Sequence, residues 1–130
     1  MPEEDRPEQR TAEAIDVLQR HGAIFGYVHG SRAAGTAKPH SDIDIAAYFE
    51  GQPPEAFELL LPAGVDLLVL NHAPLELAGR VAVHGKLLFE RDASARVIWE
   101  ATTRKIYFDE LPRMTRAHQE FAETVLRRGG

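Results

Sequence analysis

Residues 30–44 read GSRAAGTAKPHSDID and hold the two motifs around which the rest of the chain is organised. Gly30-Ser31 comes first, and Asp42-x-Asp44 follows after ten intervening residues. The stretch lies between two β-rich runs, AIFGYVH (23–29) and DIDIAAYF (42–49). Gly30 has no side chain to keep a ligand from the backbone, and free amides at a following helix start, with the Ser31 hydroxyl, suit phosphate oxygens. The pattern predicts a strand, a phosphate-binding turn, a short helix and a second strand.

The two acids of the Asp-x-Asp motif are expected to share one face of the second strand, because successive side chains of an extended chain face opposite ways. Paired oxygen ligands of this kind suit Mg²⁺, which proteins usually hold with one or two carboxylates plus substrate phosphates. Each motif alone has a plainer explanation: Gly-Ser is most often a turn, and Asp-x-Asp is most often a pair of solvated residues. Their combination at this spacing favours a cation site, because two adjacent like charges repel.

Asp66 lies in the otherwise apolar run VDLLVL (65–70), which predicts a central strand buried on both faces. An unpaired carboxylate in such a strand is costly to desolvate. The alternative is an Asp at the exposed start of the strand, or one that caps a turn. Since Asp42 and Asp44 already suggest a cation, we expect Asp66 to be a third metal ligand.

Strands that alternate with helices predict an α/β domain with a small mixed β-sheet flanked by helices. We expect a polar lead-in over residues 1–10, a core over residues 11–91 and a helical C-terminal segment of the same domain over residues 92–130. The expected strands are 23–29, 42–49, 65–70 and 86–89, and the expected helices are 11–20, 32–37, 55–61 and 74–83.

Three residues mark expected helix ends. Gly22 lies where a left-handed terminator belongs, and Pro39 should end the short helix after Ser31. Pro112 should break or kink the C-terminal segment, leaving helices near 92–111 and 114–127.

The composition excludes several classes of protein. The 130 residues are 44% hydrophobic and 27% charged, which is typical of one globular core. The chain has no cysteine, which excludes a disulfide scaffold, a thiolate zinc site and a cysteine nucleophile. With 15 Lys and Arg against 20 Asp and Glu, it is a poor candidate for direct nucleic-acid binding. It shows no apolar signal segment and no membrane-length run, so we expect a cytoplasmic protein without membrane contact.

The chain resembles the polymerase-β-like nucleotidyltransferase superfamily and, more narrowly, the minimal nucleotidyltransferase (MntA-like) antitoxins of HEPN/MNT toxin–antitoxin pairs. The resemblance runs from about residue 11 to residue 125 and rests on GSRAAGTAKPHSDIDIAAYF (30–49), VDLLVLNHAP (65–74) and VHGKLLFERD (83–92). It implies the nucleotidyltransferase fold and metal-dependent transfer of AMP from ATP to a hydroxyl group. In the antitoxins this hydroxyl is implied to belong to a tyrosine of the cognate HEPN ribonuclease toxin, which is thereby neutralised.

The resemblance also implies roles for individual residues. Asp42 and Asp44 would hold two Mg²⁺ ions, and Asp66 would complete the catalytic metal site. Gly30 and Ser31 would hold the phosphates that leave as pyrophosphate. Arg32 is placed to reach the triphosphate, although an arginine on a short exposed helix is as often merely solvated.

Two other functions stay open. One is nucleotidyl transfer to a small hydroxylated molecule, as in aminoglycoside-modifying relatives, for which 130 residues leave little room. The other is a non-catalytic antitoxin that sequesters its toxin, with the helical tail as a docking surface. His29, His40 and His72 flank the expected cleft, but no two of them have the i, i+4 spacing of helical metal ligands, so we assign none of them to the site.

Overall fold

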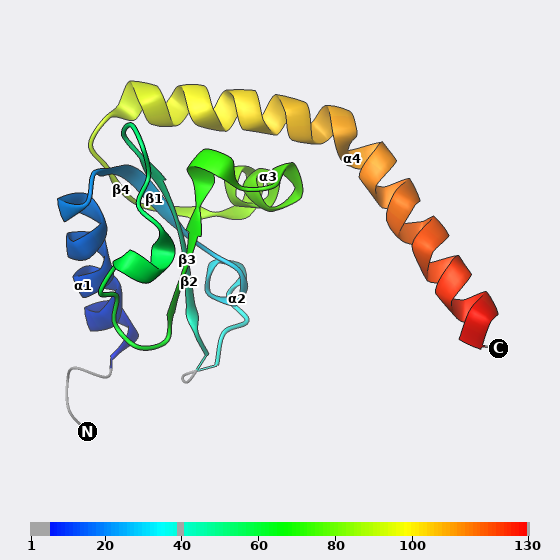
Figure 1. Cartoon of the computed structure of the whole chain (residues 1–130), viewed down its shortest axis with the longest axis horizontal. Helices are drawn as coiled ribbons and strands as arrows, with labels where there is room; N and C mark the ends of the chain where they lie inside the picture. Colours follow the sequence, from blue (N-terminus) through cyan, green and yellow to red (C-terminus); the bar gives the residue numbers. More distant parts are fainter. Residues whose placement is uncertain (1–5, 39–40, 130) are drawn as a thin grey trace.

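The centre of the protein is a four-stranded mixed β-sheet with the strand order β3-β2-β1-β4 (Figure 1). The computed structural model describes residues 6–38 and 41–129. Strand β1 pairs antiparallel with both β2 and β4, whereas β2 and β3 run parallel. The predicted mixed sheet is therefore confirmed. The strands are β1 (Ala23–His29), β2 (Ile43–Phe49), β3 (Val65–Val69) and β4 (Lys86–Glu90).

The prediction that residues 65–70 form a central strand is wrong. Strand β3 lies at the edge of the sheet, next to β2 alone. Leu67 packs against the core on one face of the sheet, and Leu68 packs against the core on the other. The strand is apolar because both of its faces pack against the core. A strand at the edge of a sheet can be covered in this way as well as one at the centre. Its free edge leaves Asp66 exposed to solvent.

Helix α1 (Pro7–Arg20) covers one face of the sheet. Its Ala14 and Leu18 are buried against Ile43, Ile45 and other apolar side chains of β2. The helix begins four residues before the expected start, because Pro7 suits the first turn, where its missing amide is not needed. The part of the polar lead-in over residues 1–5 lies outside the described residues. Gly22 follows the helix with a φ of 95°, as predicted.

Helices α3 (Leu75–His84) and α4 (Ala93–Gly129) cover the opposite face. This second core contains five buried side chains from the sheet and from the segments that follow it, with Trp99 of α4 packed against them. A Cβ on Gly79 would overlap the ring of Tyr107, so glycine permits the close contact between α3 and α4. The buried members of this core are Phe25, Tyr27, Ala46, Leu70 and Val81.

Three short helical segments complete the fold. Helix α2 (Ser31–Ala34) follows the Gly-Ser turn and is shorter than the expected 32–37. The 3₁₀ segments are η2 (Ala56–Glu58), in place of the expected helix over 55–61, and η3 (Leu70–His72). Pro39, which was expected to end the first of these helices, lies outside the described residues, as does His40.

Helix α4 is one helix of 37 residues that contains Pro112, so the prediction of two helices is wrong. Proline removes one backbone hydrogen bond and bends a helix, but the turns on either side can continue. Figure 1 shows the helix axis changing direction in its orange part, and the red end extending away from the sheet. Although α4 is about 55 Å long at about 1.5 Å per residue, neither it nor any other helix of the described residues is apolar enough to cross a membrane.

A hydrogen-bonded carboxylate fixes α4 to the sheet. The Tyr27 hydroxyl donates to Oε1 of Glu100 over 2.5 Å, and Arg96 Nη1 donates to the same oxygen over 3.0 Å. The Glu100 side chain is only 16% exposed. Burial acts to raise the pKa of Glu100, but the hydrogen bonds from Tyr27 and Arg96 outweigh burial, so this pKa is lowered.

We expect Glu100→Gln to lower the free energy of unfolding at pH 7 by about 1–3 kcal/mol, because the variant weakens charge-assisted hydrogen bonds. The pKa of Glu100 is lower in the folded state, so its contribution is present above the unfolded pKa of about 4.3 and is lost as pH falls through the folded pKa. The difference between variant and wild type should therefore shrink in acid. Urea unfolding at several pH values measures it.

The matched control is Asp16→Asn, which removes an exposed ion pair of 2.8 Å with Arg20. Exposed pairs contribute about 0–1 kcal/mol, so this control should change stability little. Equal stability of Glu100→Gln and wild type at neutral pH would show that the Glu100 carboxylate does not fix α4 to the sheet.

Candidate functional site

The Gly-Ser turn lies directly against the acid of β2. Gly30 has a φ of 69°, in the left-handed region that favours glycine. A Cβ on this residue would fall on Oδ2 of Asp44. Glycine thus allows the backbone at the end of β1 to approach the carboxylate, and Ser31 begins α2 immediately afterwards.

Asp44 and Asp66 lie opposite each other in the parallel pair of β2 and β3. Neighbouring strands are about 4.8 Å apart, and register partners face the same side of a sheet. This side carries α3 and α4, because Ala46, two residues after Asp44, belongs to the core beneath these helices. Strand β1 is the other neighbour of β2, and the register partner of Asp44 in β1 is His29. Asp44 is half-buried and Asp66 is exposed.

Asp42 lies just before β2 and is exposed. Its Oδ1 is 3.8 Å from the position that a Cβ on Gly64 would take. The described ion pairs include none with Asp42, Asp44 or Asp66. Over residues 6–38 and 41–129, no three His, Asp or Glu side chains are grouped closely enough to hold a metal ion. The chain thus brings Asp44 and Asp66 together, with Asp42 at the margin.

This donor set fits Mg²⁺ bound together with a nucleotide better than a metal site made by protein alone. Mg²⁺ is typically held by one or two carboxylates, with substrate phosphates and water completing its shell. Asp44 and Asp66 supply two carboxylates on one face, and the bare backbone at Gly30 leaves room for phosphate oxygens beside them. The residues present therefore fit a divalent cation that arrives with a phosphate ligand.

Arg32 takes part in a structural contact. Its Nη2 donates to the backbone oxygen of Ser41 over 2.6 Å, which fixes α2 to the loop before Asp42. Its Nε is buried and has no hydrogen-bond partner among the described residues. The nucleotide-binding role expected for Arg32 stays a prediction.

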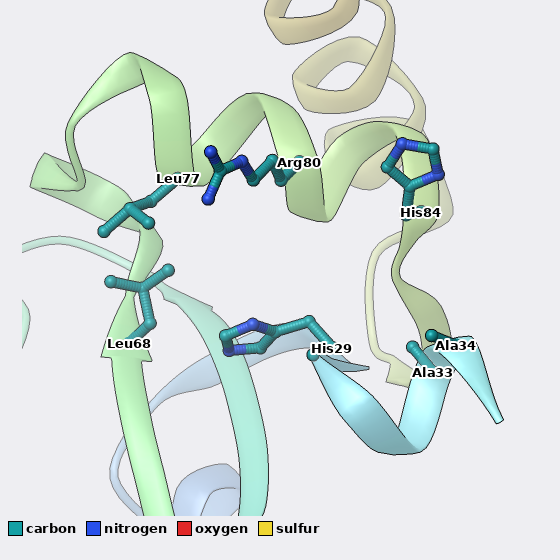
Figure 2. Close-up of a pocket in the computed structure, with 8 residues that line it drawn as sticks. His29, Ala33, Ala34, Leu68, Leu77, Arg80 and His84 are labelled. Atoms are coloured by element: carbon teal, nitrogen blue, oxygen red, sulfur yellow. The ribbon is translucent and has the colours of Figure 1, made fainter. Parts of the chain in front are cut away.

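A cavity of about 420 Å³ opens beside Gly30, between α2, β3 and α3 (Figure 2). Burial lowers the pKa of His29 at its edge, while the Asp44 carboxylate opposes this shift. Sequence reasoning set His29 aside and missed the contribution of α3, because the sequence does not reveal that α2 and α3 line the same cavity. The lining residues are His29, Gly30, Ala33, Ala34, Leu68, Leu77, Arg80 and His84.

A Gly-Ser turn at the end of β1 thus lies beside strand carboxylates on a small mixed sheet, as the resemblance to nucleotidyltransferases led us to expect. The family model described as "Polymerase beta, Nucleotidyltransferase" matches residues 12–94. The chain belongs to this nucleotidyltransferase family. No curated protein matches the chain.

Similar solved structures are toxin–antitoxin complexes. A toxin–antitoxin with AMP-PNP is 22% identical over 88% of this chain and 97% of that chain, with a TM-score of 0.64. A mutant MntA–HpeT toxin–antitoxin is 25% identical over 89% of this chain and 97% of that chain, with a TM-score of 0.66. A tri-AMPylated Shewanella oneidensis HEPN toxin in complex with MNT antitoxin is 19% identical over 92% of this chain and 98% of that chain, with a TM-score of 0.60.

We expect Gly30→Ala to destabilise the protein more than Gly51→Ala. Both glycines have positive φ, 69° and 67°, so a side chain strains the backbone at either position. Only the Cβ at residue 30 meets the Asp44 carboxylate, whereas the one at residue 51 meets nothing within 4 Å. The extra overlap should cost about 1–3 kcal/mol more, measured by urea unfolding. Equal losses for the two variants would show that the turn does not press against Asp44.

Proposed function

We propose that this protein is an antitoxin that transfers AMP from ATP to a tyrosine hydroxyl of a partner HEPN ribonuclease toxin and thereby neutralises it. The observation that carries the proposal is the register of Asp44 and Asp66 beside the Gly30-Ser31 turn. Family membership supports nucleotidyl transfer. The AMP-PNP complex and the tri-AMPylated HEPN toxin among the structural neighbours support the nucleotide and the type of partner.

The residues present suit each part of such a transfer. Gly30 and Ser31 would hold the two phosphates of ATP that leave, and Asp42, Asp44 and Asp66 would hold two Mg²⁺ ions. When bound, these ions supply charge neutralisation at the leaving pyrophosphate and activation of the attacking hydroxyl. The bond between the acceptor oxygen and the α-phosphorus forms as the bond to pyrophosphate breaks. Phosphoryl transfer depends mainly on positioning and charge stabilisation, so the chain needs no nucleophile of its own.

The exposed side of Asp66 fits an approach by a second protein. Asp66 lies on the free edge of the sheet and is exposed, whereas Asp44 is half-buried next to the turn. An acceptor hydroxyl can therefore reach Asp66 from solvent, and we assign to this carboxylate the removal of the hydroxyl proton.

The end of α4 offers an apolar surface for the same partner. Beyond Pro112, the side chains of Phe121, Val125 and Leu126 are 71%, 51% and 75% exposed. Val125 follows Phe121 by four residues, so these two side chains share one side of the helix, and Leu126, the next residue, widens the apolar surface by about 100° around the helix axis. An amphipathic helix of this kind binds a protein groove with its apolar side. We propose that this surface docks on the HEPN toxin.

We expect the wild-type protein, mixed with ATP, Mg²⁺ and its HEPN partner, to add about 329 Da to the partner for each AMP transferred. Asp44→Asn should reduce the rate of transfer by at least about 100-fold, because a neutral amide binds a divalent cation poorly. Intact-mass spectrometry over time measures the rate. The matched control is Asp109→Asn, an exposed position on α4 that should leave the rate unchanged.

The same experiment separates the alternatives. A partner that stays unmodified but is still neutralised after Asp42→Asn and Asp44→Asn together would favour sequestration without catalysis. Turnover only with small hydroxylated molecules would favour the aminoglycoside-type activity.

We expect Phe121→Glu combined with Leu126→Glu to weaken partner binding by about tenfold or more, because exposed apolar anchors contribute strongly to interfaces. Both side chains are exposed, so the stability of the free protein should not change. Isothermal titration with the partner measures affinity. Leu60→Glu, which changes a 90% exposed leucine outside α4, is the control, and equal affinity of all three proteins would place the docking surface elsewhere.

A further inference from the structure

The cavity between α2, β3 and α3 lies next to the carboxylates of Asp44 and Asp66. Leu68, in its wall, follows Asp66 by two residues on the same face of β3. His29, also in its wall, is the register partner of Asp44, and Gly30 belongs to both the turn and the cavity. A molecule whose phosphates lie over the carboxylates and the turn therefore has this cavity directly beside it.

The lining of the cavity suits a flat, uncharged ring. Leu68 and Leu77 form an apolar wall on one side, and Ala33 and Ala34 of α2 lie on the other (Figure 2). The polar side chains among the lining residues are those of His29, Arg80 and His84. Small-molecule sites have volumes of about 300–1,000 Å³ and combine mostly apolar walls with a few polar groups. The cavity, at about 420 Å³, has both properties.

Arg80 fits a neutral ring better than a phosphate chain. Its Nη2 is already paired with Oε1 of Glu76 over 2.9 Å, so part of its charge is neutralised. Glu76 is also 3.4 Å from His118 of α4. A guanidinium held in this way keeps its planar face, which stacks well on aromatic rings. Figure 2 shows Arg80 and Leu77 on α3 extending over the cavity opposite Leu68 and His29.

We propose that this cavity binds the purine base and ribose of the nucleotide donor, with Leu68 and Leu77 against the base and the Arg80 guanidinium stacked on it. The proposal rests on the proposed function, because it assumes that the phosphates lie at Gly30 and Asp44. It assigns nucleotide recognition to α3, an element that supplies none of the carboxylates.

The test compares two probes, AMP-PNP and inorganic tripolyphosphate, each titrated calorimetrically in Mg²⁺. Both carry three linked phosphates, but only AMP-PNP has a base and a ribose. Ala34→Trp places a large ring at the exposed side of the cavity, and Ala12→Trp makes the same change at an exposed position of α1 on the opposite face of the sheet. Arg80→Ala removes the stacking group from an exposed position, and Arg113→Ala, whose side chain is 82% exposed, is its control.

We expect Ala34→Trp and Arg80→Ala each to weaken AMP-PNP binding by about tenfold or more, the scale of a lost stacking contact with a base. Tripolyphosphate affinity and both control variants should match the wild type. Arg80→Ala keeps the test decisive if the bulky variant does not fold.

Three results would overturn the proposal. Equal loss of both probes would assign the cavity to the phosphate chain. Unchanged AMP-PNP affinity with slower transfer to the partner would assign it to the acceptor's aromatic ring. Both results leave the proposed function intact, whereas failure of the wild type to bind either probe would remove the proposed function together with this inference.

Discussion

Two carboxylates held in register on neighbouring parallel strands are the constraint on which this site depends. Asp44 and Asp66 are register partners in parallel strands, and the described ion pairs leave both unpaired. Gly30 adds to this arrangement, because its lack of a side chain lets the backbone approach the Asp44 carboxylate closely. The arrangement suits a divalent cation that arrives with phosphates.

The rest of the fold supports this arrangement from both faces of the sheet. Helix α1 holds β2 from one face through Leu18. On the other face, α3 and α4 pack over the sheet, and a cavity opens beside Gly30 between α2, β3 and α3. The hydrogen bonds of Glu100 to Tyr27 and Arg96 fix the start of α4 to the sheet, so the far half of the helix projects from a rigid base (Figure 1). The cavity and the exposed helix end thus lie on elements that the core holds in place.

Local patterns predicted most of the fold. The alternation in 42–49 and the β-rich run 23–29 correctly gave β2 and β1, because their side chains carry the signal themselves. The place of β3 was predicted wrongly, because a strand covered on both faces is apolar at an edge as well as at the centre. The continuity of α4 through Pro112 also escaped prediction, since proline lowers helix stability without always ending the helix. The candidate acids were predicted from their spacing along the sequence, whereas the place of Arg80 and His84 beside the cavity depends on tertiary packing that no local pattern records.

The central claim is that Asp44 and Asp66 bind a divalent cation jointly with a nucleotide. Electron paramagnetic resonance of Mn²⁺, used in place of Mg²⁺, tests it most directly. The account predicts little binding of Mn²⁺ to the protein alone, clear binding when AMP-PNP is present beyond that of AMP-PNP itself, and loss of this extra binding in Asp66→Asn. Mn²⁺ binding that is the same with and without AMP-PNP, or that survives replacement of Asp66, would contradict it.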